Sequence, residues 1–188
     1  MVQRIRPHWV SSWVSKIGVR IGALVAGEGE QKLMARLVAA GTDRFRGKKR
    51  EVFGSRVIDL KVSAQDTNGG LAVTEIIDVE KGGPARHLHH EQEEWFYVVE
   101  GEYVIEVGEE RYELGPGDCV LAARKVAHGW AYVGEGKGRL IAALQPAGEI
   151  EAFLEELAKL GSTPAREELG RVFSWHGMEL MGPPLSIE

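Results

Sequence analysis

Apolar and polar positions alternate through the middle of the chain. From Arg56 onward the period is two, with Ile58, Leu60 and Val62 on one face and polar residues between them. Successive side chains of a strand point to opposite faces, so this pattern predicts a strand with one buried side. The strand ends at the turn-forming run Asp-Thr-Asn-Gly-Gly, residues 66–70.

Further short strands follow at intervals of about ten residues, and Gly, Pro or Asp turns separate them. The predicted strands are Leu71–Asp78, His87–His89, Trp95–Val99, Tyr103–Val107, Arg111–Leu114, Cys119–Ala122, Gly129–Val133 and Leu140–Leu144. Many short strands with evenly spaced turns are typical of a sandwich or a closed barrel. We therefore expect an all-β domain, either a sandwich or a closed barrel, over residues 51–148.

The flanking segments lack this alternation. Residues 1–50 form a basic arm whose fold we leave unassigned, except for a predicted helix over residues 34–40 and a linker through the basic cluster at residues 44–50. After residue 148 the apolar residues return at helical spacing and predict a first helix. A second helix is predicted from Thr163 as its cap to the stop at residues 176–177, so residues 149–188 form a C-terminal helical extension.

Composition narrows the class of protein. The chain has 188 residues, of which 44% are hydrophobic, and its single cysteine, Cys119, excludes an intrachain disulfide. Residues 51–188 carry 12 Lys and Arg against 25 Asp and Glu, and this acidic body argues against a nucleic-acid interface. The apolar run at residues 21–27 is far shorter than the roughly 20 residues of a membrane span. We expect a soluble, cytoplasmic protein that binds neither nucleic acid nor membrane.

A cluster of histidines and glutamates supplies the candidate chemistry. His87 and His89 stand at positions i and i+2 of a predicted strand, so their rings point to the same side and can share one metal ion. A carboxylate would offset the charge of the ion. Glu94 has the same parity as the apolar positions of the next strand, and Glu93 is the fallback. His128, from a distant strand, is the best candidate for a fourth ligand.

Several neighbouring residues allow two interpretations. Five residues line an aromatic substrate pocket or simply fill the core of a small barrel: Phe96, Tyr103, Ile105, Trp130 and Tyr132. His90 faces solvent, or replaces a ligand if the strand bulges. Cys119 serves packing better than nucleophilic chemistry. Arg86 and Glu75 contact substrate, face solvent or pair with each other.

Two stretches resemble the motifs of a known family. Residues 82–89, Gly-Gly-Pro-Ala-Arg-His-Leu-His, followed by Glu94 and Gly101, resemble the first cupin motif. Residues 117–128, Gly-Asp-Cys-Val-Leu-Ala-Ala-Arg-Lys-Val-Ala-His, resemble the second. The second motif departs from the family pattern, which usually has proline at the position of Ala123, glycine near that of Lys125, and an asparagine shortly after the histidine.

The resemblance covers residues 55–148, and the stretches 146–148 and 182–185 also look like cupins described as quercetin-dioxygenase-like. It implies a double-stranded β-helix, or jelly-roll, barrel with an N-terminal arm and C-terminal helices. It further implies a homodimer that holds one divalent ion of iron, manganese, nickel, cobalt, copper or zinc. The ligands that it implies are His87, His89, Glu94 and His128.

The predicted function is that of a metal-dependent dioxygenase of a small hydroxylated, quercetin-like substrate. Three imidazoles and one carboxylate leave coordination positions open for substrate and dioxygen, and Glu94 would accept the substrate's proton. A non-catalytic cupin that binds a small ligand or a structural metal is the first alternative. A metal-assisted isomerase of a sugar or keto acid is the second, and it would need a further polar base across the pocket.

Overall fold

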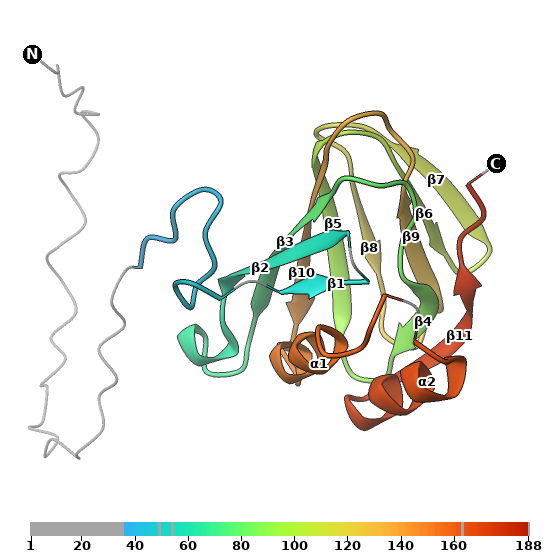
Figure 1. Cartoon of the computed structure of the whole chain (residues 1–188). Coiled ribbons are helices and arrows are strands. Elements are labelled where there is room, and N and C mark those ends of the chain that lie inside the picture. The colour runs from blue at the N-terminus through green and yellow to red at the C-terminus, as the bar shows by residue number, and fades with distance from the viewer. Residues whose placement is uncertain (1–35, 49, 54, 163, 188) are drawn as a thin grey trace, which may run out of the picture. The chain divides into compact units, whose positions relative to one another are not determined.

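Two antiparallel sheets face each other and enclose the core, as the all-β jelly-roll prediction requires (Figure 1). The computed structural model describes residues 36–48, 50–53, 55–162 and 164–187. None of the helices in these ranges is long and apolar enough to cross a membrane.

The strand order joins segments that lie far apart in the sequence. The first sheet contains, in spatial order, β1 (Glu51–Val52), β2 (Arg56–Val62), β3 (Ala72–Asp78), β10 (Gly138–Gln145), β5 (Glu93–Glu100) and β8 (Cys119–Ala122). The second contains β11 (Met178–Pro184), β4 (Ala85–His89), β9 (His128–Tyr132), β6 (Tyr103–Val107) and β7 (Glu110–Leu114). The predicted strands agree with β2 to β10 within two residues at each end, whereas β1 was not predicted.

Alternation along each strand decides which side chains fill the barrel. On β5, Glu94, Phe96 and Val98 are buried, whereas Trp95 is exposed. The parity that selected Glu94 in the sequence is therefore confirmed. Burying one large apolar side chain contributes about 1.5–3 kcal/mol to folding, so this alternation holds the register of the strands.

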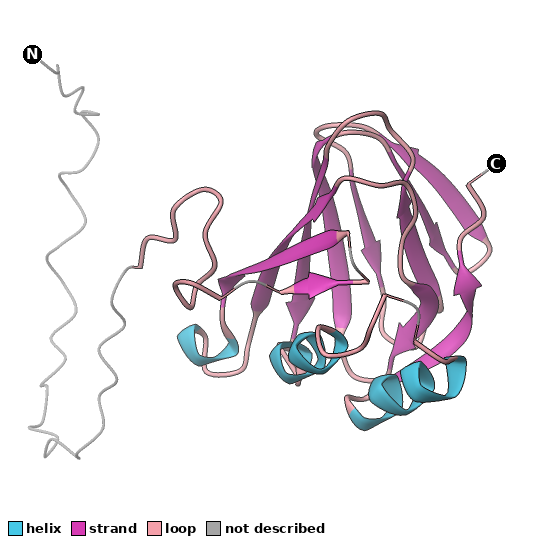
Figure 2. Cartoon of the chain, viewed as in Figure 1, coloured by secondary structure: helices cyan, strands magenta, loops and turns pink. Residues whose placement is uncertain are grey.

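Two helices lie together at one end of the barrel (Figure 2). α1 (Ile150–Leu157) buries the stripe Ile150, Phe153, Leu154 and Leu157 that its helical spacing predicted. α2 (Arg166–Trp175) buries Val172 and Phe173, and a short 3-10 helix, η1 (Ala64–Asp66), follows β2. Thr163, the predicted cap of α2, lies outside the described residues, and the residue before the helix is Ala165.

Two predictions for the N-terminal segment are wrong. Residues 36–40 form no helix; residues 34 and 35 lie outside the described ranges. The basic cluster is more than a linker, because Arg44 donates two hydrogen bonds to the carboxylate of Asp66, and Arg50 is buried against Asp43. A buried guanidinium needs a carboxylate partner. The sequence spacing did not reveal that Asp66 and Asp43 are these partners.

The C-terminal extension contains a strand as well as helices. β11 pairs with β4 in antiparallel register, with Met178 opposite His89 and Leu180 opposite His87. The sequence analysis did not predict this strand, whose two prolines and glycine weaken the signal. β11 therefore covers the edge of the strand that carries two of the candidate ligands.

Candidate metal centre

Three strands bring the four candidate ligands together. His87 and His89 lie on β4, Glu94 is the second residue of β5, and His128 begins β9. β4 and β9 are neighbours, and His87 stands directly opposite His128 in their register. All four side chains are buried, and the ring centroids of His87 and His128 are 4.8 Å apart.

The donor atoms of the four residues surround one point. The Oε2 atom of Glu94 lies 3.1 Å from Nε2 of His89, 3.1 Å from Nε2 of His128 and 4.0 Å from Nε2 of His87. All four donor atoms lie within 4.8 Å of one another. Two atoms that each bond an ion at about 2.1 Å are separated by about 3.0 Å when they are adjacent and about 4.2 Å when they are opposite. The cluster therefore has the size of a single metal site.

Backbone and side-chain acceptors fix the histidine tautomers. Nδ1 of His87 lies 2.8 Å from the carbonyl oxygen of Ala85, and Nδ1 of His128 lies 2.9 Å from that of Val126. A carbonyl can only accept a hydrogen bond, so both Nδ1 atoms carry the proton. The lone pair is then on Nε2, which points to the centre, as a metal-binding histidine requires.

Gln92 performs the same role for His89. Its Oε1 lies 3.1 Å from Nδ1 of His89, while its Nε2 donates to the carbonyls of Pro146 and Ala147. Because the amide nitrogen is held by two acceptors, the amide oxygen must face the ring. The loop before α1 thus orients His89 on β4 through Gln92. The sequence analysis missed this contact, because no local sequence pattern indicates it.

Burial and mutual contact set the charges of the cluster. Burial, together with the neighbouring His128, lowers the pKa of His87 to about 3. Burial also acts to lower the pKa of His89, but contact with the charge of Glu94 outweighs it and the pKa is raised. Burial acts to raise the pKa of Glu94, yet its contacts with His128 and His89 hold that pKa well below the usual range. Glu94 therefore remains a carboxylate.

The chemistry of this donor set fits a divalent metal ion. Nε2 of His89 is buried and makes no hydrogen bond within the described part of the chain, although Oε2 of Glu94 is only 3.1 Å away. A buried polar atom without a partner is costly, and an ion would supply the partner. Imidazole and carboxylate ligands suit zinc, iron, manganese, nickel, cobalt and copper alike, so the ligand types leave the identity of the ion open.

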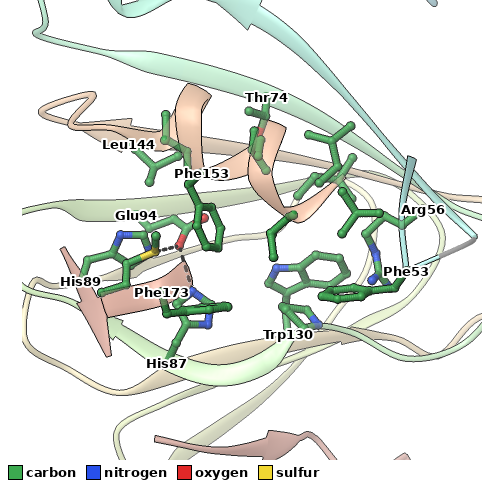
Figure 3. Close-up of a pocket in the computed structure, with 18 residues that line it drawn as sticks. Phe53, Arg56, Thr74, His87, His89, Glu94, Trp130, Leu144, Phe153 and Phe173 are labelled. Carbon is green, nitrogen blue, oxygen red and sulfur yellow. Dashed lines mark ion pairs between the residues drawn. The ribbon is translucent and has the colours of Figure 1, made fainter. Parts of the chain in front are cut away.

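A small cavity of about 70 Å³ opens beside the cluster, and Figure 3 shows the side chains that line it. Its wall is mostly apolar and includes Phe153 and Phe173 from the two helices. Among the described lining residues, the polar side chains other than His87, His89 and Glu94 are Arg56 and Thr74. An engineered apolar cavity of about 150 Å³ accommodates benzene, so this one suits only a smaller chemical group.

Of the five residues proposed for the pocket, Trp130 lines this cavity. Phe96, Tyr103, Ile105 and Tyr132 are buried in the core and are not among its described lining residues. Their inward direction is as expected, but the strands carry them to a part of the barrel that side chains fill.

The residues for which the sequence left two interpretations open lie outside the metal cluster. Glu93 lies outside the cluster, paired with Arg124 at 2.6 Å, and His90 is exposed. Arg86 and Glu75 do not pair with each other: Arg86 donates to the carbonyls of residues 108 and 127, and Glu75 meets Lys61 and Arg139. Cys119 is exposed at the start of β8, so the expectation that it serves packing is wrong.

The sequence analysis did not predict that Arg56, Phe153 of α1 and Phe173 of α2 line the cavity. Phe153 belongs to the predicted helical stripe, which indicated burial but not what the stripe covers. Arg56 begins a predicted strand, and its position before the alternating apolar residues gave no sign that it faces a cavity. These residues become neighbours only when α1 and α2 fold across the end of the barrel.

Comparison with known proteins gives one family match. The model of a cupin domain matches residues 75–144, which include all four candidate ligands. A comparison with curated proteins gives no match.

Similar solved structures include three bacterial proteins. KdgF from Halomonas sp. is 20% identical, with a TM-score of 0.48, over 53% of this chain and 86% of its own. An RmlC-like cupin from Shewanella frigidimarina is 26% identical, with a TM-score of 0.48, over 55% and 87%. A predicted oxalate decarboxylase from Thermotoga maritima is 14% identical, with a TM-score of 0.47, over 48% and 80%.

The domain match and the two-sheet topology concern the same part of the chain. Residues 75–144 run from β3 to β10 and include the three strands that carry the cluster. This part of the chain is therefore similar to a cupin domain, and it holds a buried group of three histidines and one glutamate that could bind a metal ion.

Proposed function

We propose that this cupin is a metal-dependent dioxygenase that acts on a hydroxyl-bearing small molecule. The observation that carries the proposal is the buried cluster of three imidazoles and a carboxylate, of which His87, His89 and Glu94 line a mostly apolar cavity. A bound ion would supply Lewis-acid and redox chemistry at this point, with coordination positions left for substrate.

In this proposal His87, His89 and His128 hold the ion, and their Nδ1 contacts keep each ring in place. Glu94 is the catalytic base. Its carboxylate lines the cavity and would take the proton of the substrate hydroxyl. The phenylalanines of α1 and α2 exclude water from the reacting group.

The lining favours this reaction over a metal-assisted isomerisation. An isomerase would need a second acid or base facing the substrate, but apart from the ligands the described polar lining is Arg56 and Thr74. Arginine stays protonated and threonine is a weak acid, so neither provides that base. A mostly apolar wall also suits a sugar poorly.

The volume restricts what reacts at this site. A cavity of about 70 Å³ admits a hydroxyl-bearing end of a molecule, not a whole flavonol, in this arrangement of α1 and α2. We therefore expect small catechols, enediols and diketones to be better substrates than quercetin, unless the helices move apart.

Oxygen consumption tests the proposal. Protein loaded separately with each candidate metal is offered this panel, and incorporation of labelled dioxygen into the product is followed by mass spectrometry. Uptake that is lost in Glu94→Gln and kept in the neighbouring control Glu93→Gln would support the proposal. If no metal form consumes oxygen while metal still raises the melting temperature, the protein is a non-catalytic metal-binding cupin.

A further inference from the structure

A second hollow adjoins the metal cavity. This outer groove has a volume of about 560 Å³ and runs along β4, β11 and the start of α2. Phe53 and Arg56 line both spaces, so the groove and the cavity meet at these two side chains. Figure 3 shows them at the end of the cavity away from His87, His89 and Glu94. The groove is therefore placed to receive the part of a substrate that the small cavity cannot hold.

The groove combines positive charge with apolar surface. Lys81, Arg166 and Arg56 line it, and its described lining residues include no aspartate or glutamate. Lys81 lies 2.7 Å from Glu135, but the Glu135 side chain is 92% exposed, and such a pair is weak and easily exchanged. Leu169 and Leu180 supply part of the apolar surface.

Arg56 is held rigidly at the junction. Its Nε donates to Asp78 at 2.5 Å, its Nη2 donates to the carbonyl of Gly82 at 3.1 Å, and its guanidinium lies over the Trp130 ring at 4.7 Å. The residue is only 6% exposed. Within the described residues Nη1 donates to no acceptor, so its N–H groups remain for a ligand oxygen. Asp78 balances the charge of this guanidinium, so Arg56 offers an oxyanion a preorganised N–H donor, and the positive charge of the groove comes from Lys81 and Arg166.

We propose that the substrate is an elongated amphipathic oxyanion, whose anionic group binds in the outer groove and whose reacting end enters the metal cavity. Arg56 donates Nη1 to the anionic group, Lys81 and Arg166 supply further positive charge, and the apolar body passes Phe53. The inference rests on the proposed function for the reacting end, but the anion site itself needs no bound metal. Carboxylate and phosphate share this chemistry, and the experiment distinguishes them.

Calorimetric titration tests the anion site with three eight-carbon probes: octanoate, octyl phosphate and 1-octanol. The full-length protein is titrated as purified and again after metal removal. We expect at least one oxyanion to bind about tenfold or more tightly than the alcohol in both forms, because charge-assisted hydrogen bonds contribute at least that much. The oxyanion that binds more tightly identifies the preferred head group.

Exposed cations allow a matched pair of variants. The double variant Lys81→Ala/Arg166→Glu should lose the preference for the oxyanion, while the affinity for 1-octanol stays unchanged. The control Lys137→Ala/Arg171→Glu makes the same changes at exposed positions outside the groove, one of them on the same helix, and should keep the preference. Arg56 is left intact because its removal would strand the buried Asp78.

Three results would overturn the inference: equal affinity for all three probes, no binding of any of them, or equal losses in the two double variants. These results are independent of oxygen chemistry. An oxyanion preference without oxygen uptake leaves the anion site standing and removes the dioxygenase proposal. Oxygen uptake without an oxyanion preference would support the dioxygenase proposal and overturn the anion site.

Discussion

The two ends of the barrel share strands but are filled differently, and β9 connects them. His128 begins this strand at the metal centre, whereas Tyr132 ends it about 13 Å further along, in a closed end. There Tyr103 and Tyr132 pack directly on glycine backbone, and a Cβ added at Gly138 would lie 2.5 Å from Oη of Tyr103. At the metal end, the helices bridge the opening and leave a cavity of about 70 Å³. Close packing thus stabilises one end, and incomplete packing provides a site at the other.

The closed end should give the largest effect on stability. A Cβ added at Gly83 would lie 1.6 Å from the backbone oxygen of Trp130, beside the bridge between Gly82 and Tyr132. Backbone cannot yield as a side chain can, so Gly83→Ala should lower the free energy of unfolding by more than about 4 kcal/mol or prevent folding. Urea denaturation measures this. Gly161→Ala, where a Cβ meets nothing within 4 Å, is the control and should be nearly neutral.

The metal end should respond through metal affinity. Glu94→Gln removes the charge that three imidazoles surround, so we expect at least about a hundredfold weaker binding. Competition with a chromogenic chelator measures it, and the increase in melting temperature on metal addition should disappear. Glu93→Gln, which disturbs only an exposed ion pair, should retain both. Equal losses in the two variants would contradict the placement of Glu94.

Acid should weaken metal binding at the metal end of the barrel. In the metal-free protein, contact with Glu94 raises the pKa of His89, so this ring holds a proton to higher pH than an ordinary histidine. Metal must displace that proton, so affinity should fall about tenfold per pH unit below the pKa of His89 and level off above it. Glu94 stays ionised across this range because its pKa is lowered. Metal affinity that does not change between pH 5 and 8 would contradict ligation by His89.

A smaller effect on stability is expected at the hydroxyl of Tyr103. This hydroxyl donates to Oδ2 of the buried Asp78 at 2.9 Å, and Oδ1 of Asp78 accepts a hydrogen bond from Arg56. Tyr103→Phe keeps the packing but leaves one acceptor unsatisfied, which should cost about 1–3 kcal/mol. Thermal denaturation measures it, and metal affinity should stay that of the wild type. A large loss of metal would show that the two ends are coupled.

Local pattern was enough to predict most of the barrel and the candidate cluster. The period of two follows from strand geometry, so Ile58, Leu60 and their equivalents identified strands without knowledge of their partners. The same geometry placed His87 and His89 on one side and separated Glu94 from Glu93. These inferences succeeded because each depends on residues a few positions apart.

Contacts over long sequence separations were decided only by the tertiary structure. Pairing of β11 with β4, orientation of His89 by Gln92 through the loop before α1, and burial of Arg50 against Asp43 all depend on how distant segments meet. Inward direction alone could not tell which aromatic residues line a cavity and which fill the core. That distinction depends on where the two helices close the barrel, since packing energy comes from the whole set of neighbours and not from the strand that carries the residue.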